Sequence, residues 1–411
     1  MKKITLSAVA VLTLLPNVLS AEGFTLLSDA KFNGELRPRF ESVSIEDSTK
    51  KDADAFSVRA TLGLEAQLLG ISGLSMKVDG TTVQTLGGTH YNDLSPTKDA
   101  SYEIVADPEQ TRFTQAYLQY KYGSTTVKAG RQILNLDNQR FIGSVDWRQM
   151  MQSLDAVSVT NTSVAGLSLS GAYVYSYATV FEEPTWDSKS VIVNGTYKIS
   201  DMVKITAYDY MISSEKASYG SDTYGLALTG DLPVAMAKVA YRAEYAQQGD
   251  ATFKTIGSVK KENDATYYNL DALANISGLL VGAGYEVLSG STGSDGKTAF
   301  ATPLATLHAF NGWADKFLAT PTGGLKDMSL SLGYTAPGLG KAMAVYHDFE
   351  TDKAMSEKND LGSEWDILYT NAIPGIKGLS GLAKAAYFRG GDVSGFDKDV
   401  TKIWLQLGYK F

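Results

Sequence analysis

The sequence has no cysteine, little proline and little histidine, and beyond its first residues it has no long apolar run. It contains 10 prolines and 3 histidines in 411 residues. Without cysteine, a secreted chain has no disulfide framework, even in a compartment that can form disulfides. No stretch after residue 21 has the roughly 20 apolar residues that a transmembrane helix requires. The fold must therefore be stabilised in another way, such as by a closed hydrogen-bonded sheet in lipid.

Positive charge and catalytic motifs are also scarce. The net charge of −8 argues against nucleic acid as a partner, because its capture relies on Lys and Arg neutralising phosphates. His90, His308 and His347 lie in no nucleophile motif, and the sequence has no HExxH pair. Hydrolysis needs a nucleophile, a base and an orienting group within reach of one another. We therefore expect no enzyme activity, no catalytic residues, no metal site and no cofactor, and we expect the three histidines to be surface polar residues.

The N-terminus carries the features of a secretory signal peptide. The chain begins with Met1-Lys2-Lys3, continues with an apolar run from Ile4 to Leu19, and reaches its first acid at Glu22. A positive start, a short apolar run and small residues before the cleavage site are typical of such peptides. We expect cleavage after Ala21, or one residue earlier, with an uncleaved inner-membrane anchor as the alternative. The mature domain is then residues 22–411.

Alternation of apolar and polar residues is the main signal in the rest of the chain. From Phe56 to Leu68 every second residue is apolar, and Arg59 and Glu65 are among the residues between them. Only a strand separates two faces at period two. The run has ~13 residues, whereas soluble strands usually have about 5–6 and a tilted membrane strand needs about 9–11. The pattern recurs in residues 32–41, 167–177 and 235–248.

Short and long connections alternate along the chain. We predict short turns near residues 68–74, 122–126, 160–167, 198–203, 230–235, 274–279, 335–341 and 371–379. The longer, polar connections are residues 42–55, 84–111, 132–153, 178–189, 212–222, 247–264, 289–325, 351–363 and 390–399. Glycine in several turns permits the positive φ of a tight hairpin. Short periplasmic turns and long extracellular loops joining about eighteen strands are the layout of outer-membrane barrels.

The last strand indicates where the protein resides. Residues 401–411 alternate up to the terminal Phe411, which resembles the C-terminal signature of bacterial outer-membrane proteins. An unpaired apolar edge would aggregate, whereas pairing with the first strand closes the barrel. We predict an all-β fold, one transmembrane antiparallel barrel in the outer membrane of a Gram-negative cell. Its expected partners are outer-membrane lipid and lipopolysaccharide, and the barrel-assembly machinery through the strand ending in Phe411.

Arginine is the most informative residue type for the lumen. Four arginines fall on polar strand faces and three lie in or beside the third long loop, while acids share the same faces. Arginine stays charged and binds carboxylates bidentately, so such a lumen suits anionic solutes. The alternative is a mixed ladder of cross-strand ion pairs. The pore-lining candidates are Arg37, Arg39, Arg59, Arg242, Arg131, Arg140, Arg148, Glu35 and Glu65.

The segment GRQILNLDNQRFIGSVDWRQ (residues 130–149), followed by SLDAV (153–157), resembles the alginate-export family of outer-membrane barrels. The early segment ELRPRFE (35–41) is similar to the first strand of that family, apart from its proline. The resemblance implies an eighteen-stranded barrel with a positively charged constriction. It assigns Arg131, Arg140, Arg148 and Asp155 to the family motif, with Arg37 and Arg39 on the first strand, and so adds Asp155 to the pore-lining candidates.

These observations favour a porin-like channel for the diffusion of small hydrophilic solutes, with anionic solutes as the candidate class. A dedicated exporter of an anionic polysaccharide such as alginate is the first alternative, and an outer-membrane hydrolase is a disfavoured second. We expect loop 132–153 to fold into the barrel and narrow it, with Trp147 packed against the wall. Arg131 and Arg148 either present a cationic ring to the solute or, as paired struts, merely hold the loop in place.

Overall fold

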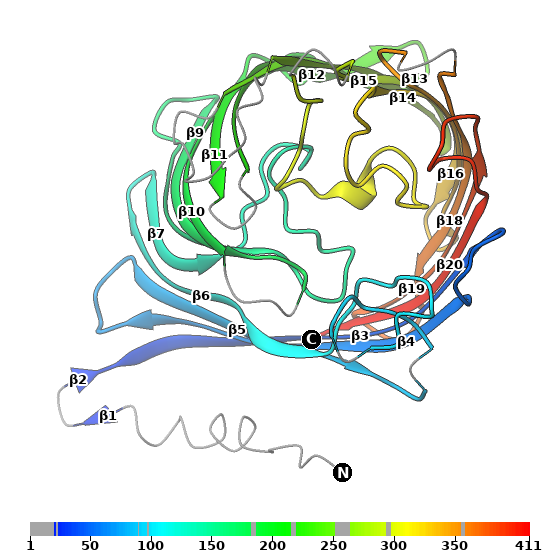
Figure 1. Ribbon diagram of the computed structural model, residues 1–411. Helices are drawn as coiled ribbons and strands as arrows, with labels where there is room; N and C mark the ends of the chain where they lie inside the picture. The colour runs from blue at the N-terminus through cyan, green and yellow to red at the C-terminus, as the bar shows by residue number, and fades with distance from the viewer. Residues whose placement is uncertain are drawn as a thin grey trace.

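The computed structural model describes residues 20–21, 24–88, 90–96, 98–181, 186–214, 219–250, 264–292, 297–354 and 358–411. In this part of the chain eighteen antiparallel strands, β3 to β20, form a closed barrel (Figure 1). The strands are β3 (Leu27–Ile45), β4 (Ala53–Leu68), β5 (Leu74–Thr85), β6 (Gln110–Tyr122), β7 (Thr125–Gln132), β8 (Ser153–Asn161), β9 (Leu167–Ala178), β10 (Trp186–Lys198), β11 (Lys204–Ser214), β12 (Tyr219–Val234), β13 (Ala237–Asp250), β14 (Ala265–Ile276), β15 (Leu279–Ser289), β16 (Gly324–Ala336), β17 (Gly340–Glu350), β18 (Asp360–Ala372), β19 (Leu379–Gly390) and β20 (Val400–Lys410). The predicted fold class and strand number are confirmed.

Outside the barrel, β1 (Ser20–Ala21) and β2 (Phe24–Thr25) form a separate two-stranded sheet. The predicted signal peptide, residues 1–21, lies outside the described residues except for Ser20 and Ala21. Among the described residues, no helix has the length and apolar character to span a bilayer.

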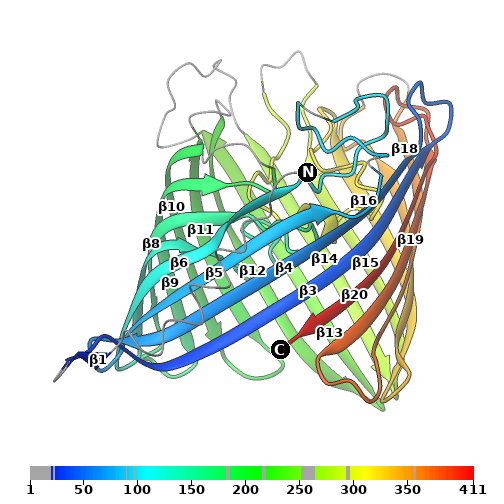
Figure 2. The ribbon, with the colours of Figure 1, turned by 90° about the horizontal axis from the view of Figure 1, so that it is seen from below.

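Neighbouring strands are joined by short turns at one end of the barrel and mostly by longer connections at the other (Figure 2). The predicted turns fall between the expected strands, with one displacement. The turn expected at residues 230–235 lies later, because β12 continues to Val234 and β13 begins at Ala237. Ala235 adopts a φ of 53° in this tight turn. Alternation of connection length is therefore a reliable guide to the two ends of the barrel.

The two faces of the wall have the inverted polarity expected of a membrane barrel. Leu62 on β4 points outward and is 44% exposed, whereas Arg59 on the same strand points inward and is 1% exposed. Leu226 on β12, Leu332 on β16 and Leu405 on β20 are also exposed on the outer face. Apolar side chains facing outward and charged ones facing inward suit a wall with lipid outside and a polar lumen.

The barrel closes as the alternating C-terminus predicts. Strand β20 pairs with β3, and Gly34 and Phe411 exchange backbone hydrogen bonds of 2.9 and 3.1 Å beyond the end of β20. The pairing is interrupted once, between Arg39 and Leu36 of β3, and resumes in the same register. Pro38 lies in this gap, and proline has no N–H to donate to a ladder. The unusual proline of the first strand is therefore placed at the closing seam.

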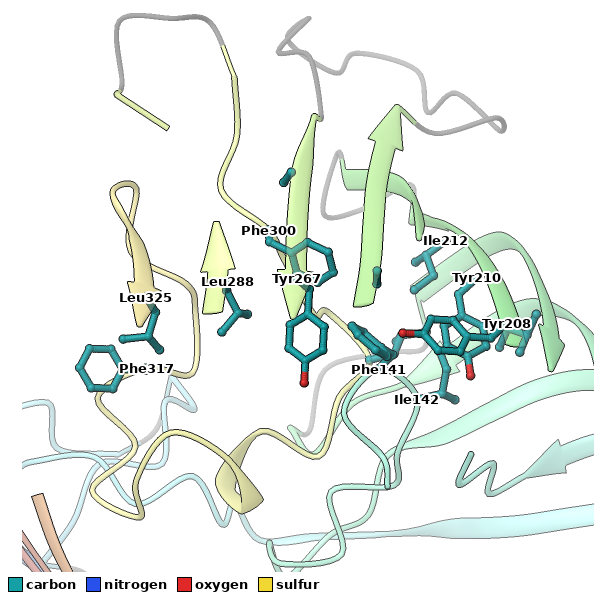
Figure 3. Close-up of a cluster of buried hydrophobic side chains, with 14 of the residues drawn as sticks. Phe141, Ile142, Tyr208, Tyr210, Ile212, Tyr267, Leu288, Phe300, Phe317 and Leu325 are labelled. Carbon is teal, nitrogen blue, oxygen red and sulfur yellow. The ribbon is translucent and has the colours of Figure 1, made fainter. Parts of the chain in front are cut away.

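An aromatic cluster fills part of the barrel interior (Figure 3). Phe141, which comes from the connection after β7, lies between Tyr267 of β14 and Tyr208 of β11, with ring centroids 5.3 Å from each. Phe300, from the connection after β15, packs against Phe141 at 5.9 Å. Such ring pairs contribute about 0.5–1.5 kcal/mol each beyond the area they bury. Two extracellular connections are thus packed inside the barrel.

Candidate functional site

Two extracellular loops enter the barrel and touch each other there (Figure 1). We call residues 133–152 the third loop and residues 290–323 the seventh loop; the seventh contains a short 3-10 helix, Leu307–Ala309. The N–H of Gly143 donates to the carbonyl of Leu304 at 2.8 Å, and the N–H of Thr306 donates to that of Gln139 at 3.0 Å. The expectation that loop 132–153 folds inward is confirmed, and the seventh loop accompanies it.

At one side of the lumen the third loop is held by β13 and β15. Arg242 of β13 donates to Asp137 of the loop and to its own strand neighbour Glu244. In a second ion pair the loop supplies the cation and the wall the acid: Arg140 binds Glu286 of β15 bidentately, at 2.8 and 3.0 Å. Asn311 of the seventh loop accepts a further bond from Arg140 at 2.9 Å. Bidentate charged pairs fix orientation as well as distance.

At the other side of the lumen the third loop is held by β3 and β4, through its residue Asp146. Its carboxylate lies 2.7 Å from Nη1 of Arg59 and 3.7 Å from Nη1 of Arg37. Arg59 also pairs with Glu35. The guanidinium of Arg37 donates to the carbonyl of Asp146 and to the side chain of Gln149 as well. The third loop therefore crosses the lumen from one wall to the other.

Trp147, the next residue, packs against the wall as expected. The guanidinium carbon of Arg39 lies 4.2 Å from the centre of its ring. The ring of His308 is stacked on it at 4.4 Å, and the ammonium of Lys384 on β19 lies 4.2 Å from its centre. Cations over the face of tryptophan are attracted by its quadrupole, and more strongly where water is excluded. Trp147 thus joins the third loop to β3, β19 and the seventh loop.

Arg148 completes the anchor. It binds Glu41 of β3 at 3.1 Å and Asp315 of the seventh loop at 2.8 Å, and all three side chains are buried. Lys402 of β20 binds the same carboxylate of Asp315 at 3.0 Å. A buried charge is tolerated when it is paired and hydrogen-bonded, as these are. Three consecutive residues, 146 to 148, therefore contact the wall, the outer two through ion pairs of opposite sign and Trp147 through cation–π contacts.

Lys384 lies in a cage of aromatic rings. Its ammonium is 3.6 Å from the ring of Trp313, 5.4 Å from that of Trp404, and 2.8 Å from Nε2 of His308. Burial holds the pKa of His308 well below its usual value, so the imidazole is neutral. Its Nδ1–H then donates to Asp315 at 2.6 Å while Nε2 accepts from Lys384. The expectation that His308 is a surface residue is wrong, because the seventh loop folds inward.

The seventh loop is also bound through its backbone. The N–H of Trp313 donates to Asp366 at 3.2 Å and that of Ala314 donates to Glu364 at 2.7 Å, both on β18. Gly312 has a φ of 83°, and a Cβ there would lie 2.5 Å from Oε2 of Glu364. Carboxylates that accept from backbone N–H groups give strong bonds. The conformation of Gly312 permits this close approach.

Of the ten predicted pore-lining residues, eight face the lumen. Seven of them lie in the network around the third loop: Arg37, Arg39, Arg59, Arg140, Arg148, Arg242 and Glu35. The eighth, Glu65, faces the lumen near the turn end of β4.

The prediction is wrong for Arg131 and Asp155, which face the membrane side of the wall. They form a bidentate pair of 2.7 and 2.8 Å, and Arg131 also reaches the carbonyl of Phe113, whose side chain is exposed on the outside. The physical reason is strand parity. Gln132, next to Arg131, is buried and binds Ser158 inside the barrel, so Arg131 must point outward. The expected cationic ring of Arg131 and Arg148 therefore does not form.

Three residues that bind the loops were not foreseen from the sequence: Glu286, Asp315 and Lys384. Glu41 also binds the third loop; alternation places it on the same polar face as Arg37 and Arg39, although it was not among the pore-lining candidates. The others gave no signal, because their partners lie far away in the sequence.

The arrangement offers fixed charges and hydrogen bonds rather than reactive groups. Nearly every guanidinium in the lumen already binds a carboxylate or carbonyl oxygen. In the part of the chain that is described, no group of three or more His, Cys, Asp and Glu side chains is placed to hold a metal ion. What such a site can do is restrict a polar passage and set the electric field across it.

The sequence matches the model of the alginate export family over residues 30–251, which is more than half of the chain. No curated protein matches it. The fold is similar to that of Pseudomonas aeruginosa OccK8 (OprE), with a TM-score of 0.71, 15% identity and coverage of 94% of this chain and 99% of that one. For Acinetobacter baumannii OccAB4 the TM-score is 0.69 and the identity 14%, with coverage of 94% of this chain and 98% of that one. For P. aeruginosa OpdK, solved with vanillate, the TM-score is 0.71 and the identity 13%, with coverage of 94% of this chain and 99% of that one. At these identities the similarity concerns the fold.

Proposed function

Because the chain belongs to the alginate export family and is an outer-membrane barrel, we propose that it is a porin-like channel for small hydrophilic solutes. One observation carries the proposal. Inside a barrel with an apolar exterior, a loop is fixed across the lumen by charged side chains on both walls. A constriction of this kind limits the size of a solute and exposes it to fixed charges.

We propose that anionic solutes are the preferred class. Arg37, Arg39 and Arg59 lie side by side on β3 and β4, and two further cations, Lys402 and Lys384, lie on the neighbouring strands β20 and β19. Arginine matches the geometry of carboxylates. OpdK, which has a similar fold, was solved with vanillate, an aromatic carboxylate. The pore-lining role of these residues follows from this proposal.

Export of an anionic polysaccharide is the alternative function, and the family match favours it. The two functions differ in what the constriction must pass. A polymer needs a continuous path for a chain of sugars, whereas the third and seventh loops are joined to each other and to both walls. This favours passage of small solutes.

The test is to record single-channel currents of the folded protein in planar bilayers, with reversal potentials measured in a KCl gradient. We expect discrete conductance steps and block by gluconate, a sugar carboxylate. Block by an oligouronate at much lower concentration than by a neutral oligosaccharide of equal length would favour the exporter. A folded, inserted protein without conductance would contradict both functions.

We infer that the protein is not an enzyme and has no cofactor. The charged groups of the lumen support this inference, since they are engaged in anchoring the loops. Glu364 and Asp366 are two nearby acids on β18, and both accept bonds from the seventh-loop backbone. Hydrolysis of ester or glycoside substrates by the purified barrel, abolished by a single substitution at these acids, would contradict the inference.

We propose that residues 1–21 are a cleaved signal peptide, that residues 22–411 form the mature protein, and that the barrel-assembly machinery recognises the strand ending in Phe411. The backbone bonds of Phe411 to Gly34 at the seam support the last point. Deleting Phe411 should slow assembly and leave protein in the periplasm. Levels in outer-membrane fractions are the measurement, with Lys410→Ala as the matched control. Normal levels of the deletion variant would contradict this role.

A further inference from the structure

Asp146 has an unusual place among the acids of the third loop. Its side chain is 55% exposed, whereas those of Arg37 and Arg59, which it touches, are only 6% and 2% exposed. The other anchoring acids, such as Glu41 and Asp315, are almost completely buried. Asp146 therefore lies on the lumen side of two arginines, between them and whatever passes.

The surroundings of these arginines show why they are covered. Arg59 is held between Glu35 and Asp146, and Arg37 directs its donors to Asp146, Arg148 and Gln149 of the third loop. The two carboxylates balance the charges of the two buried guanidinium groups, and the ammonium of Lys410, 4.0 Å from Glu35, adds a solvent-exposed cation at the edge of the cluster. Arginines balanced in this way give a passing anion little attraction.

Asp146 is also held firmly from both sides along the chain. Trp147 is stacked between Arg39 and His308, and Arg148 is bound by Glu41 and Asp315. These contacts fix the backbone of Asp146, whose carbonyl itself accepts from Arg37 at 2.8 Å. The carboxylate is thus a tethered group at a site that a solute carboxylate would fit.

We propose that Asp146 occupies the Arg37–Arg59 site as an internal carboxylate, and that it determines the ion selectivity of the channel by masking these arginines. The proposal rests on the channel function. According to this proposal, the acid Asp146, and not the arginines alone, determines how strongly the channel prefers anions. When its charge is removed, the cluster keeps two cations and one carboxylate, and a carboxylate-bearing solute takes the vacated position.

The experiment compares wild type with Asp146→Asn in planar bilayers under a KCl gradient. Asparagine keeps the size of the side chain and an oxygen for Arg59, so the loop remains anchored by its neighbours. We expect the chloride-to-potassium permeability ratio to rise by about twofold or more, since one uncompensated charge at a constriction acts strongly. Half-block by gluconate should occur at a several-fold lower concentration.

The matched control is Glu65→Gln, which removes the same charge from an exposed lumen position at which no contact with arginine is found among the described residues. It should shift selectivity clearly less. A second variant, Asp146→Ser, should reproduce the asparagine result; both are checked for heat-modifiable folding. Equal shifts in Asp146→Asn and Glu65→Gln, or an unchanged ratio in folded Asp146→Asn, would overturn the proposal. Absence of conductance in wild type would instead contradict the channel function itself.

Discussion

The third and seventh loops both fold into the barrel, but they bind its wall by different chemistry. The third loop uses charged side chains, with Arg140 on Glu286 and Arg148 on Glu41. Among the described residues, the seventh has one ion pair with the wall, Asp315 on Lys402, and otherwise uses backbone N–H groups that donate to Glu364 and Asp366, together with the rings of Phe300 and Phe317. The third loop supplies charges of both signs to the wall, whereas the seventh supplies one acid. A loop can therefore be held inside the barrel with many charged contacts or with few.

The difference has an energetic consequence. Removing one partner of a buried ion pair leaves the other charge without compensation, at a cost of about 3–5 kcal/mol. Removing one backbone hydrogen bond costs about 1–3 kcal/mol, and one aromatic ring pair contributes about 0.5–1.5 kcal/mol. We therefore expect the third loop to be lost abruptly when one charge is deleted, and the seventh loop to loosen in smaller steps.

The largest effect is expected for Arg148→Ala. Arg148 is the charged link between Glu41 of the wall and Asp315 of the seventh loop, and both acids are buried. The substitution should lower the free energy of unfolding by about 3–5 kcal/mol. The midpoint of urea unfolding in detergent micelles measures it, and single-channel records should show larger, noisier currents as the loops detach.

Arg148→Lys is the control, because it keeps the charge while it cannot bind two carboxylates with the same fork geometry. It should fall between wild type and Arg148→Ala. If Arg148→Ala unfolds at the wild-type midpoint with unchanged current noise, then the charged anchoring of the third loop has been overestimated.

An intermediate effect is expected for Gly312→Ala in the seventh loop. A Cβ there would lie 2.5 Å from the Glu364 carboxylate, at a φ of 83°. Strain of this kind costs about 1–3 kcal/mol. The seventh loop should become more sensitive to protease, while the third loop keeps its contacts with β3 and β13. Gly338→Ala is the matched control, because its φ is 77° but nothing lies within 4 Å of the added carbon. Gly338 lies in the turn between β16 and β17, so equal protease sensitivity of the seventh loop in both variants would contradict a specific role of Gly312 in holding the loop.

The barrel could be predicted from the sequence because the alternation that specifies its strands involves only neighbouring residues. Period-two alternation decides which face each side chain occupies, and Arg59 and Leu62 lie as that rule predicts. The same rule explains the error at Arg131. Val127 and Ala129 share its parity and are exposed outside, so alternation would have placed Arg131 on the outer face had it been followed across the motif.

The seventh loop could not be predicted in this way. Its Asp315 pairs with Arg148 of the third loop, which is far away in the sequence. Its bonds to Glu364 and Asp366 come from backbone N–H groups, which every residue except proline possesses. Backbone donors are not marked by any particular residue type in the sequence. Such contacts depend on where two loops meet after the barrel has formed, which no local pattern determines.

The smallest effect is expected from pH, through the contact that joins both loops. His308 stacks on Trp147 of the third loop and donates to Asp315 of its own loop, and its Nε2 accepts from Lys384 of the wall. Protonation would bring a further cation beside Lys384 and Arg148, although Asp315 also faces the ring. Burial lowers the pKa of His308 well below its usual value, so the docked loops bind fewer protons than the detached ones.

The stabilisation from neutral His308 is therefore complete above about pH 6.5, the ordinary value for histidine, and decreases as the pH falls from there toward its lowered pKa. Each pH unit within this window changes the docking free energy by at most about 1.4 kcal/mol.

Three of the 5 tryptophans, Trp147, Trp313 and Trp404, surround Lys384, so tryptophan emission between pH 6.5 and pH 5 reports on the docking. We expect a gradual red shift with acidification in wild type and a flat response in His308→Gln, which cannot titrate. An identical shift in both proteins would assign the pH response to other titratable groups of the interior, such as His347 and the acids of the network, and His308 would then be only a packing element between the two loops.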